Sequence, residues 1–170
     1  MKRELLLLRH GKSDWAVGVD DYHRPLKKRG RRSVRKIGEW LQHQELKPDW
    51  VVCSSAERAL TTAVRCCKVM GITEDAIHTE RRIYMAYFTD LLAVLSDLPA
   101  TASRVLLVGH NPGLEELLSY LVAGKLTIPP DGKLLPTATL ARLQMPDDWS
   151  ALQRGDAAVS LILRPGEIEE

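Results

Sequence analysis

The sequence has few cysteines and only a short apolar run near its start, and both shortages exclude classes of protein. Its three cysteines, Cys53, Cys66 and Cys67, are an odd number without CxxC spacing, so neither a disulfide framework nor a zinc site is predicted. The apolar run covers only Leu5 to Leu8, which is too short for the core of a signal peptide or for a membrane span. We therefore expect a soluble, cytoplasmic protein with no membrane partner.

Internal repeats, low-complexity tracts and Pro/Gly/Ser-rich linkers are also missing from the sequence. The chain has 170 residues, of which 45% are hydrophobic and 27% charged. These values are close to the average for soluble globular proteins, and the length is sufficient to bury a core. We therefore expect one domain over residues 1–170.

The net charge of +2 is unevenly distributed. Residues 1–36 contain 12 Lys/Arg and 4 Asp/Glu, a net charge of +8, whereas residues 37–170 contain 12 and 18, a net charge of −6. Seven of the ten residues from 27 to 36 are basic. Such a cluster can bind nucleic acid, or it can attract an anionic substrate or an acidic partner.

The apolar residues around the basic stretch favour a simpler interpretation. Leu26, Val34, Ile37 and Leu41 follow helical spacing, while most of the charges point elsewhere. This pattern is typical of an amphipathic helix with a solvated charged face. We prefer this interpretation of residues 27–36 to a nucleic-acid site.

Predicted strands and helices alternate along the chain. Strands are expected at 3–9, 50–54, 77–80, 104–109, 138–144 and 157–164, and helices at about 27–43, from 54 to about 71, at 89–98 and from 112 to 122. This alternation predicts an α/β fold with a mostly parallel central sheet and helices on both faces.

Two of these helices begin with capping signals. Ser54 and Glu57 have the S-x-x-E spacing of a capping box. Asn111 followed by Pro112 predicts an N-cap and a first helical residue. Both helices would therefore begin directly after a predicted strand.

Side chains suited to anion chemistry follow three of the predicted strands. Arg9 and His10 end the first strand, Arg58 lies in the first turns of the helix after the second, and His110 follows strand 104–109. In open α/β sheets, ligands bind beyond the carboxyl ends of the strands. Arginines and helix amides attract phosphate-like anions. The topology alone therefore predicts an anion-binding pocket that contains imidazoles.

The sequence around these residues resembles the histidine phosphatase (phosphoglycerate mutase-like) superfamily. Three blocks match in chain order, namely Arg9-His10-Gly11, Ser54-Ser55-x-x-Arg58-Ala-x-x-Thr61 and Val108-Gly109-His110-Asn111. The branch resembled is the short, bacterial, SixA-type phosphohistidine phosphatase, through Arg9-His10-Gly11-Lys12-Ser13-Asp14-Trp15, Asp21-x-x-Arg24-Pro25-Leu26-x-x-Arg-Gly30 and Ile83-Tyr84-x-Ala86. The resemblance covers about residues 3–165 and departs at Gly11, where the branch usually has alanine.

This resemblance implies a three-layer α/β/α sandwich and a metal-independent hydrolase without a cofactor. His10 would attack phosphorus and form a phosphohistidine intermediate, with its other ring nitrogen oriented by a backbone carbonyl group. Arg9, Arg58 and His110 would surround the phosphoryl oxygens. The substrate-binding residues would be Gly11, Asn111 and Arg24, although Arg24 could instead brace its loop.

The resemblance does not identify the general acid that many superfamily members use to protonate the leaving group. The comparable segment is Arg81-Arg82-Ile83-Tyr84, which has no carboxyl group. Glu80, Asp14 and Asp21 are candidates, and each could equally be a helix cap or a salt-bridge partner. The imidazole of a phosphohistidine accepts a proton near its ordinary pKa of about 6.5 and leaves as a neutral ring, so it needs a weak acid or none.

We therefore predict a phosphatase that acts on the phosphohistidine of phosphotransfer proteins, with no nucleic-acid partner. Only 47 residues separate His10 from Arg58, and 51 separate Arg58 from His110, which leaves little room for a capping insertion over the pocket. One alternative is a phosphatase of small phosphorylated metabolites. Another is a basic nucleic-acid-binding module with a vestigial pocket.

Overall fold

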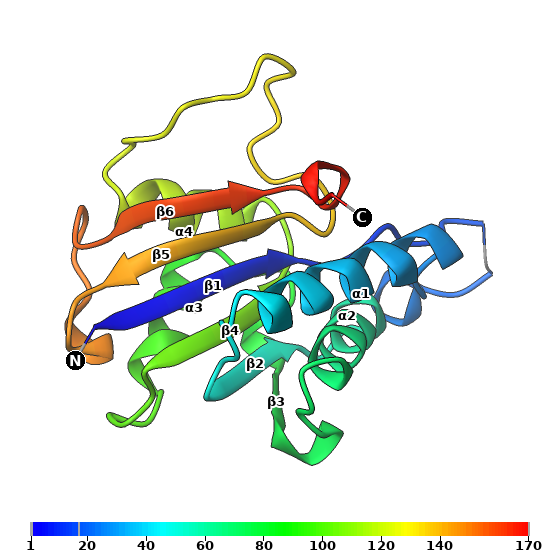
Figure 1. Ribbon diagram of the computed structural model, residues 1–170, viewed down its shortest axis with the longest axis horizontal. Coiled ribbons are helices and arrows are strands. Elements are labelled where there is room, and N and C mark those ends of the chain that lie inside the picture. The colour runs from blue at the N-terminus through cyan, green and yellow to red at the C-terminus, as the bar shows by residue number, and fades with distance from the viewer. Residues whose placement is uncertain (1, 17, 170) are drawn as a thin grey trace.

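Six strands form one mixed sheet (Figure 1) in the computed structural model, which describes residues 2–16 and 18–169. The order across the sheet is β3-β2-β4-β1-β5-β6. β1 to β4 pair in parallel, whereas β5 is antiparallel to β1 and β6 is antiparallel to β5. The bounds are β1 Arg3–Arg9, β2 Trp50–Ser54, β3 Ile77–Glu80, β4 Arg104–Gly109, β5 Leu140–Met145 and β6 Ala158–Leu163.

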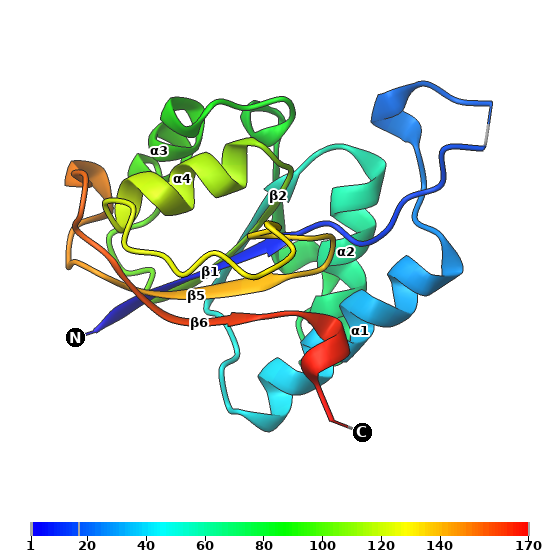
Figure 2. The ribbon, with the colours of Figure 1, turned by 90° about the horizontal axis from the view of Figure 1, so that it is seen from above.

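The four helices cover both faces of this sheet (Figure 2). They are α1 Lys28–His43, α2 Glu57–Lys68, α3 Phe88–Ser96 and α4 Gly113–Leu121. α1 and α2 pack on one face, and α3 and α4 pack on the other. The three-layer α/β/α sandwich predicted from the sequence is therefore confirmed.

The apolar run at the start of the chain forms the centre of β1. Side chains alternate between the two faces of a strand, so Leu5 and Leu7 enter the core under α3 and α4, while Leu6 and Leu8 enter the core under α1 and α2. All four are fully buried. A strand that is covered on both faces needs this continuous apolar run rather than an alternating one.

The two predicted helix caps are wrong in detail. α2 begins at Glu57 with Ala56 as its N-cap residue, and no capping-box hydrogen bond forms. Ser54 belongs to β2, and its hydroxyl oxygen accepts a hydrogen bond from the Ala56 N–H at 3.2 Å. Pro112, rather than Asn111, is the N-cap residue of α4. The side chains that follow the strands are therefore free for other contacts.

Two glycines allow α1 to pack directly on the segment that follows β1. A Cβ atom at Gly30 would lie 2.2 Å from the Lys12 carbonyl oxygen, and one at Gly11 would lie 2.8 Å from the Gly30 carbonyl oxygen. Both distances are well inside van der Waals contact and involve backbone atoms. The start of α1 is therefore held against the Arg9-His10-Gly11 segment.

The three cysteines are buried in the layer between the sheet and helices α1 and α2. Burial raises the pKa of the Cys53 thiol and of the Cys67 thiol to about 12, and it also raises the pKa of the Cys66 thiol. Among the described residues, no helix is long and apolar enough to cross a membrane.

Candidate active site

A cavity of about 310 Å³ lies at the carboxyl ends of the parallel strands. Segments that follow β1 and β4, the start of α2 and the loop before α1 bring its lining residues together. The lining residues are Arg9, His10, Lys12, Ser13, Trp15, Asp21, Arg24, Arg58, His110, Asn111 and Thr137. The strand ends thus meet at one cavity, as expected for this type of sheet.

His10 is buried, and its ring is held by the backbone. Its Nδ1 lies 2.8 Å from the carbonyl oxygen of Gly11. A carbonyl oxygen only accepts, so Nδ1 carries the proton and Nε2 keeps a lone pair. Burial lowers the pKa of His10 to about 3, with smaller contributions of the same sign from His110, Arg58 and Arg9. The ring is therefore neutral at physiological pH.

His110 packs beside His10, with 5.1 Å between the ring centroids. The Nε2 atom of His110 is hydrogen-bonded to the Ser54 hydroxyl group at 2.8 Å. Burial lowers the pKa of His110 to about 4, and the charge of Arg58 acts in the same direction. The Ser54 oxygen also accepts the Ala56 N–H, so this hydroxyl group links the start of α2 to the His110 ring.

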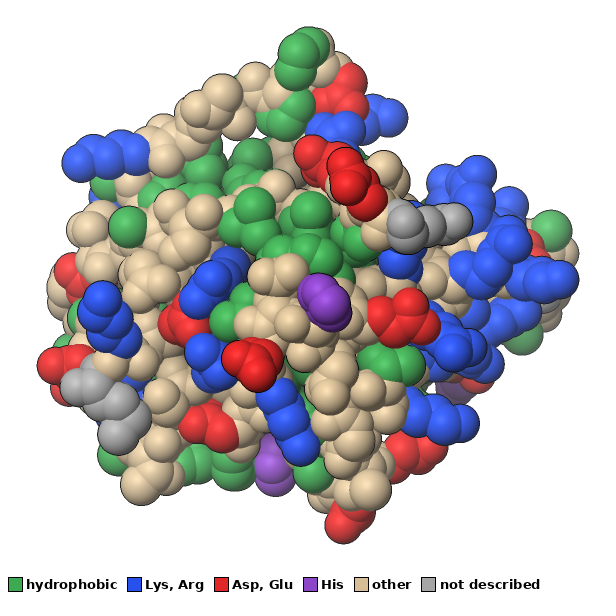
Figure 3. Space-filling view, in the orientation of Figure 1, with side chains coloured by type: hydrophobic (Ala, Val, Ile, Leu, Met, Phe, Trp, Pro, Cys, Tyr) green, Lys and Arg blue, Asp and Glu red, His purple; other side chains and the backbone are tan. Residues whose placement is uncertain are grey.

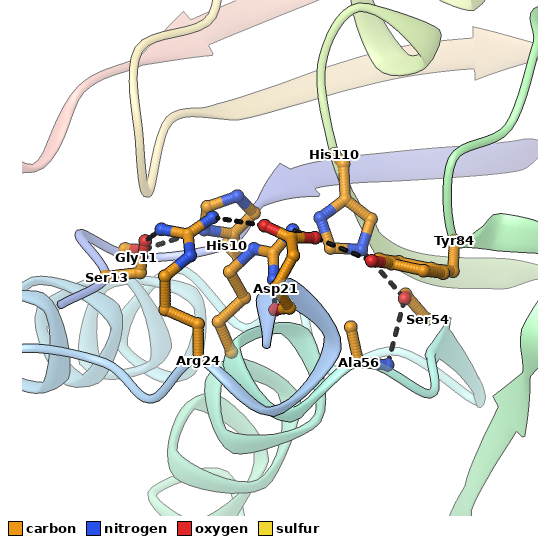
Figure 4. Close-up of polar contacts among 10 residues, drawn as sticks. His10, Gly11, Ser13, Asp21, Arg24, Ser54, Ala56, Tyr84 and His110 are labelled. Atoms are coloured by element: carbon orange, nitrogen blue, oxygen red, sulfur yellow. Dashed lines mark hydrogen bonds and ion pairs between the residues drawn. The ribbon is translucent and has the colours of Figure 1, made fainter. Parts of the chain in front are cut away.

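The carboxylate of Asp21 connects two arginines and a tyrosine (Figure 4). Its Oδ2 atom accepts from Arg58 Nη2 at 3.0 Å and from the Tyr84 hydroxyl group at 2.6 Å, and its Oδ1 atom accepts from Arg24 Nη2 at 3.1 Å. The main-chain oxygen of Asp21 accepts a further bond from Arg58 Nη1 at 2.6 Å. The Tyr84 bond and the two guanidinium groups lower the pKa of Asp21 to about 2, so this carboxyl group is an anion at neutral pH.

Arg24 is buried between this carboxylate and an aromatic ring. It donates to the Ser13 hydroxyl group, and its guanidinium carbon lies 3.5 Å from the centroid of the Trp15 ring. An arginine over the face of an indole ring is attracted by the ring quadrupole. Arg24 therefore braces its loop and also lines the cavity, and its role in substrate binding stays a prediction.

Several buried polar atoms around the cavity have no hydrogen-bond partner in the described part of the chain. They include the Nε atoms of Arg9, Arg24 and Arg58, Nδ1 of His110 and Oδ1 of Asn111. Native proteins leave few buried polar atoms unpaired, so a cluster of them at one place needs an explanation. All five atoms belong to residues that line the cavity, and three of these residues are arginines, whose guanidinium groups bind anions.

The remaining candidate residues divide between the cavity and its surroundings. Asn111 lines the cavity, and its amide nitrogen donates to Glu115 Oε2 and to the Leu135 carbonyl oxygen, each at 2.8 Å. Gly11 is not among the residues that line the cavity. Its N–H group donates to the Thr62 hydroxyl oxygen at 3.1 Å.

Of the three candidate general acids, only Asp21 lines the cavity. Glu80 is paired with Arg82 at the end of β3. Asp14 accepts the Ala16 N–H at 2.9 Å within its own loop. Among the described residues, no group of three or more His, Cys, Asp or Glu could hold a metal ion.

Sequence reasoning missed two contributors to the site. Ser54 was assigned to a helix cap, although its position at the end of β2 places it beside His110. Tyr84 was noted only as part of a branch motif, yet its hydroxyl group contacts Asp21. A signal was present for Ser54 because it ends a buried strand, whereas the branch motif was the only signal for Tyr84, which lies in an irregular segment.

Comparisons with known proteins agree with this geometry. A profile of the histidine phosphatase superfamily (branch 1) matches residues 5–83. An uncharacterized protein of Mycobacterium tuberculosis is 30% identical over 156 residues, which cover 89% of this chain and 96% of that protein. Among solved structures, a protein proposed to be the phosphohistidine phosphatase SixA of Nakamurella multipartitia matches with a TM-score of 0.83 and 28% identity, over 97% of both chains.

Two further solved structures are similar. A protein proposed to be the SixA phosphatase of Agrobacterium tumefaciens has a TM-score of 0.80 and 25% identity, over 97% of this chain and 99% of that one. The protein histidine phosphatase SixA in complex with tungstate has a TM-score of 0.82 at 20% identity, over 98% and 99% of the two chains, and is similar in fold. With the profile match and the two structures at 25–28% identity in agreement, the chain belongs to the histidine phosphatase superfamily.

Proposed function

We propose that this chain is a metal-independent phosphatase that hydrolyses phosphohistidine on proteins through a covalent intermediate on His10. The observation that carries this proposal is the convergence of three guanidinium groups and two imidazoles on one cavity. They belong to Arg9, Arg24, Arg58, His10 and His110. Guanidinium groups bind phosphoryl oxygens through charge-assisted hydrogen bonds, and a neutral imidazole supplies the nucleophile.

His10 is suited to be the nucleophile because its ring is neutral and oriented. Its Nε2 lone pair attacks phosphorus, and the bond between phosphorus and the leaving imidazole of the substrate breaks. The phosphorylated His10 ring carries phosphorus on Nε2 and a proton on Nδ1, which the Gly11 carbonyl oxygen holds. This ring is a cation, so attack by water on phosphorus releases phosphate and a neutral His10.

The surrounding guanidinium groups supply most of the expected catalysis. Negative charge spreads over the phosphoryl oxygens during transfer, and preorganised cations stabilise it. Arg9 and Arg58 are fixed by contacts to the Leu135 and Asp21 carbonyl oxygens, so they need little reorganisation. Removal of one such donor typically lowers the rate by about 100- to 1000-fold.

The state of Asp21 supports a nitrogen leaving group. Asp21 is the one carboxyl group among the described residues that line the cavity, and its pKa of about 2 keeps it ionised. It is therefore no proton donor at neutral pH. An alkoxide leaves poorly without such a donor, whereas a ring-protonated phosphohistidine releases a neutral imidazole.

The size of the cavity supports a single phosphorylated side chain as substrate. At about 310 Å³, it is at the lower end of the range of about 300–1,000 Å³ for ligand pockets. This space suits a phosphoryl group and an imidazole ring better than a large phosphorylated metabolite.

A labelling experiment tests the proposal. Incubation with a ³²P-phosphohistidine protein, followed by rapid quenching, should give an acid-labile label on His10, and His10→Ala should abolish both the label and phosphate release. Hydrolysis of phosphohistidine should exceed that of alkyl phosphates by at least about 100-fold. Label at another residue, or equal rates on the two substrate classes, would contradict the proposal.

A further inference from the structure

A cluster of basic side chains borders the cavity on the side of α1. Figure 3 shows Lys and Arg gathered over the N-terminal end of this helix and the loop before it. We call this cluster the basic collar, and it consists of Lys12, Lys27, Lys28, Arg29, Arg31 and Arg32. The sequence contains no Asp or Glu between Asp21 and Glu39, so the positive charge of the collar has no local compensation from its own segment.

The collar is attached to the nucleophile segment. Lys12 lines the cavity, and its main-chain oxygen accepts the Lys27 N–H at 2.9 Å. The close approach of Gly30 to Lys12 fixes the first turn of α1 at the same place. A shallow hollow follows on the surface, and it is lined by Asp14, Leu26, Lys27, Lys28, Arg29, Arg31 and Arg32. The basic hollow and the cavity therefore adjoin each other.

Arg31 donates to the Leu26 carbonyl oxygen at 2.8 Å, but the other basic residues at the start of α1 have no evident role in stabilising the fold. Basic residues in the first turn of a helix are unfavourable to the helix dipole, and the first turn of α1 has no acidic residue to offset them. Lys28, Arg29 and Arg32 are exposed. Within the described residues, they take part in none of the ion pairs. A helix face that only needs to be solvated would not require so many positive charges at the N-terminus of the helix.

Exposed apolar side chains occur in the two segments that supply Asp21 and Tyr84 to the site. The loop that carries Asp21 and the segment that follows Tyr84 hold four of the five large hydrophobic side chains exposed among the described residues. They are Trp15 (73% exposed), Val19 (51%), Met85 (79%) and Tyr87 (73%). Trp, Tyr, Met and Arg are the residues enriched in protein–protein interfaces.

We infer that the basic collar and these apolar side chains form a docking surface for a protein with an acidic face, which presents its phosphohistidine to the cavity. This inference rests on the proposed function. A nucleic acid could use the basic groups and could stack bases on Trp15 and Tyr87, but the exposed aliphatic side chains of Val19 and Met85 are better suited to a protein surface. A protein surface uses both kinds of contact, with charge pairs that steer encounter and apolar side chains that bury area.

A charge reversal separates docking from chemistry. The triple variant Lys28→Glu, Arg29→Glu, Arg32→Glu places acids at the start of α1, where the helix dipole favours them, so the variant should fold. Its kcat/KM for a phosphorylated, acidic histidine phosphotransfer protein should fall by at least tenfold, mainly through a higher KM. Added salt should lower the kcat/KM of the wild type for this substrate but should not lower that of the variant. Hydrolysis of free phosphohistidine should be unchanged.

The matched control reverses charges on the outer surface of α2. Arg65→Glu with Lys68→Glu reverses two charges, against three in the collar variant, on exposed residues that line neither the cavity nor the basic hollow, and it should leave both rates unchanged. An unchanged kcat/KM for the protein substrate in the collar variant would overturn the docking surface while leaving the phosphatase intact. RNA that binds the wild type but not the collar variant, and inhibits the wild type, would also overturn it. Absence of activity on both substrates in the wild type would instead contradict the proposed function.

Discussion

Two histidines that line the cavity are buried as neutral rings, and their burial makes the folded protein less stable at acid pH. Burial lowers the pKa of His10 to about 3 and that of His110 to about 4, whereas in the unfolded chain both have the ordinary pKa of about 6.5. Between these values the unfolded chain binds protons that the folded chain does not. Stability is therefore fully present above about pH 6.5 and decreases as the pH falls toward 4.

We expect the free energy of unfolding to decrease by up to about 1.4 kcal/mol per pH unit for each of the two histidines below pH 6.5. Urea unfolding at pH 7, 6 and 5 measures this slope. His10→Gln keeps a hydrogen-bond donor for the Gly11 carbonyl oxygen. It should reduce the slope by the contribution of one histidine, up to about 1.4 kcal/mol per pH unit. An identical slope in this variant would show that His10 is not buried as a neutral ring.

A second residue-scale prediction concerns Asp21, whose carboxylate lies among the cations that we propose bind phosphate. Asp21→Asn removes this negative charge, while the carboxamide oxygen still accepts from the Tyr84 hydroxyl group and the main-chain oxygen still holds Arg58. Inorganic phosphate should then inhibit at about a tenfold lower concentration. Competitive inhibition assays measure this change, and weaker inhibition would mean that the carboxylate acts chiefly by holding the two guanidinium groups in place.

The residues of the candidate site that lie at strand ends could be predicted from the sequence, whereas the contacts made by loop residues could not. Arg9, His10, Arg58 and His110 each follow a strand or begin a helix, so the topology of the sheet brings them together. Asp21 lies in a loop with no periodic pattern. No rule of sequence spacing connects Asp21 to Arg58 and Tyr84, which are more than thirty positions away. The sequence therefore did not reveal that this carboxylate would be an ionised bridge.

At the scale of elements, the close packing of α1 on the segment after β1 fixes the geometry of the nucleophile. Gly30→Ala would place a methyl group against the Lys12 backbone, which cannot move without moving the His10 segment. We expect a loss of about 1–3 kcal/mol in stability, the usual cost of overpacking, together with reduced phosphatase activity.

Urea unfolding and the rate on free phosphohistidine check the effect of Gly30→Ala. Gly18→Ala is the control, because a Cβ atom there meets nothing within 4 Å. If Gly30→Ala and Gly18→Ala behave alike, the tight contact between α1 and Lys12 is not needed for the site.

The existence and order of the elements could be predicted, whereas some of their ends could not. Long apolar runs such as 5–8 and the periodic apolar face of α4 identify buried strands and helices. The start of a helix depends on competition for single polar side chains. Ser54 is hydrogen-bonded to His110 and does not form the expected capping box with Glu57, and only the tertiary structure decides between these partners.

The whole molecule contains two cores that share one sheet. Leu6 lies in the core under α1 and α2, and Leu7 in the core under α3 and α4. Because β1 and β4 contribute to both cores, neither core can lose its strands without exposing the other. Leu6→Ala and Leu7→Ala should each cost about 2–5 kcal/mol and should each shift one common unfolding transition.

Within each protein, wild type or variant, far-UV circular dichroism and tryptophan fluorescence should give the same urea midpoint, and the midpoints of both variants should be lower than that of the wild type. A variant in which the two probes separate, or in which a second transition appears, would show that the layers unfold independently.

The burial of all three thiols has a consequence for the chemistry of the whole protein. With pKa values near 12 for Cys53 and Cys67 and a raised value for Cys66, thiolate is essentially absent at neutral pH. Peroxide and alkylating reagents attack thiolates that they can reach, and none is offered at the surface. The three cysteines thus act only as packing, and the activity should be unaffected by thiol-directed oxidants and alkylating reagents.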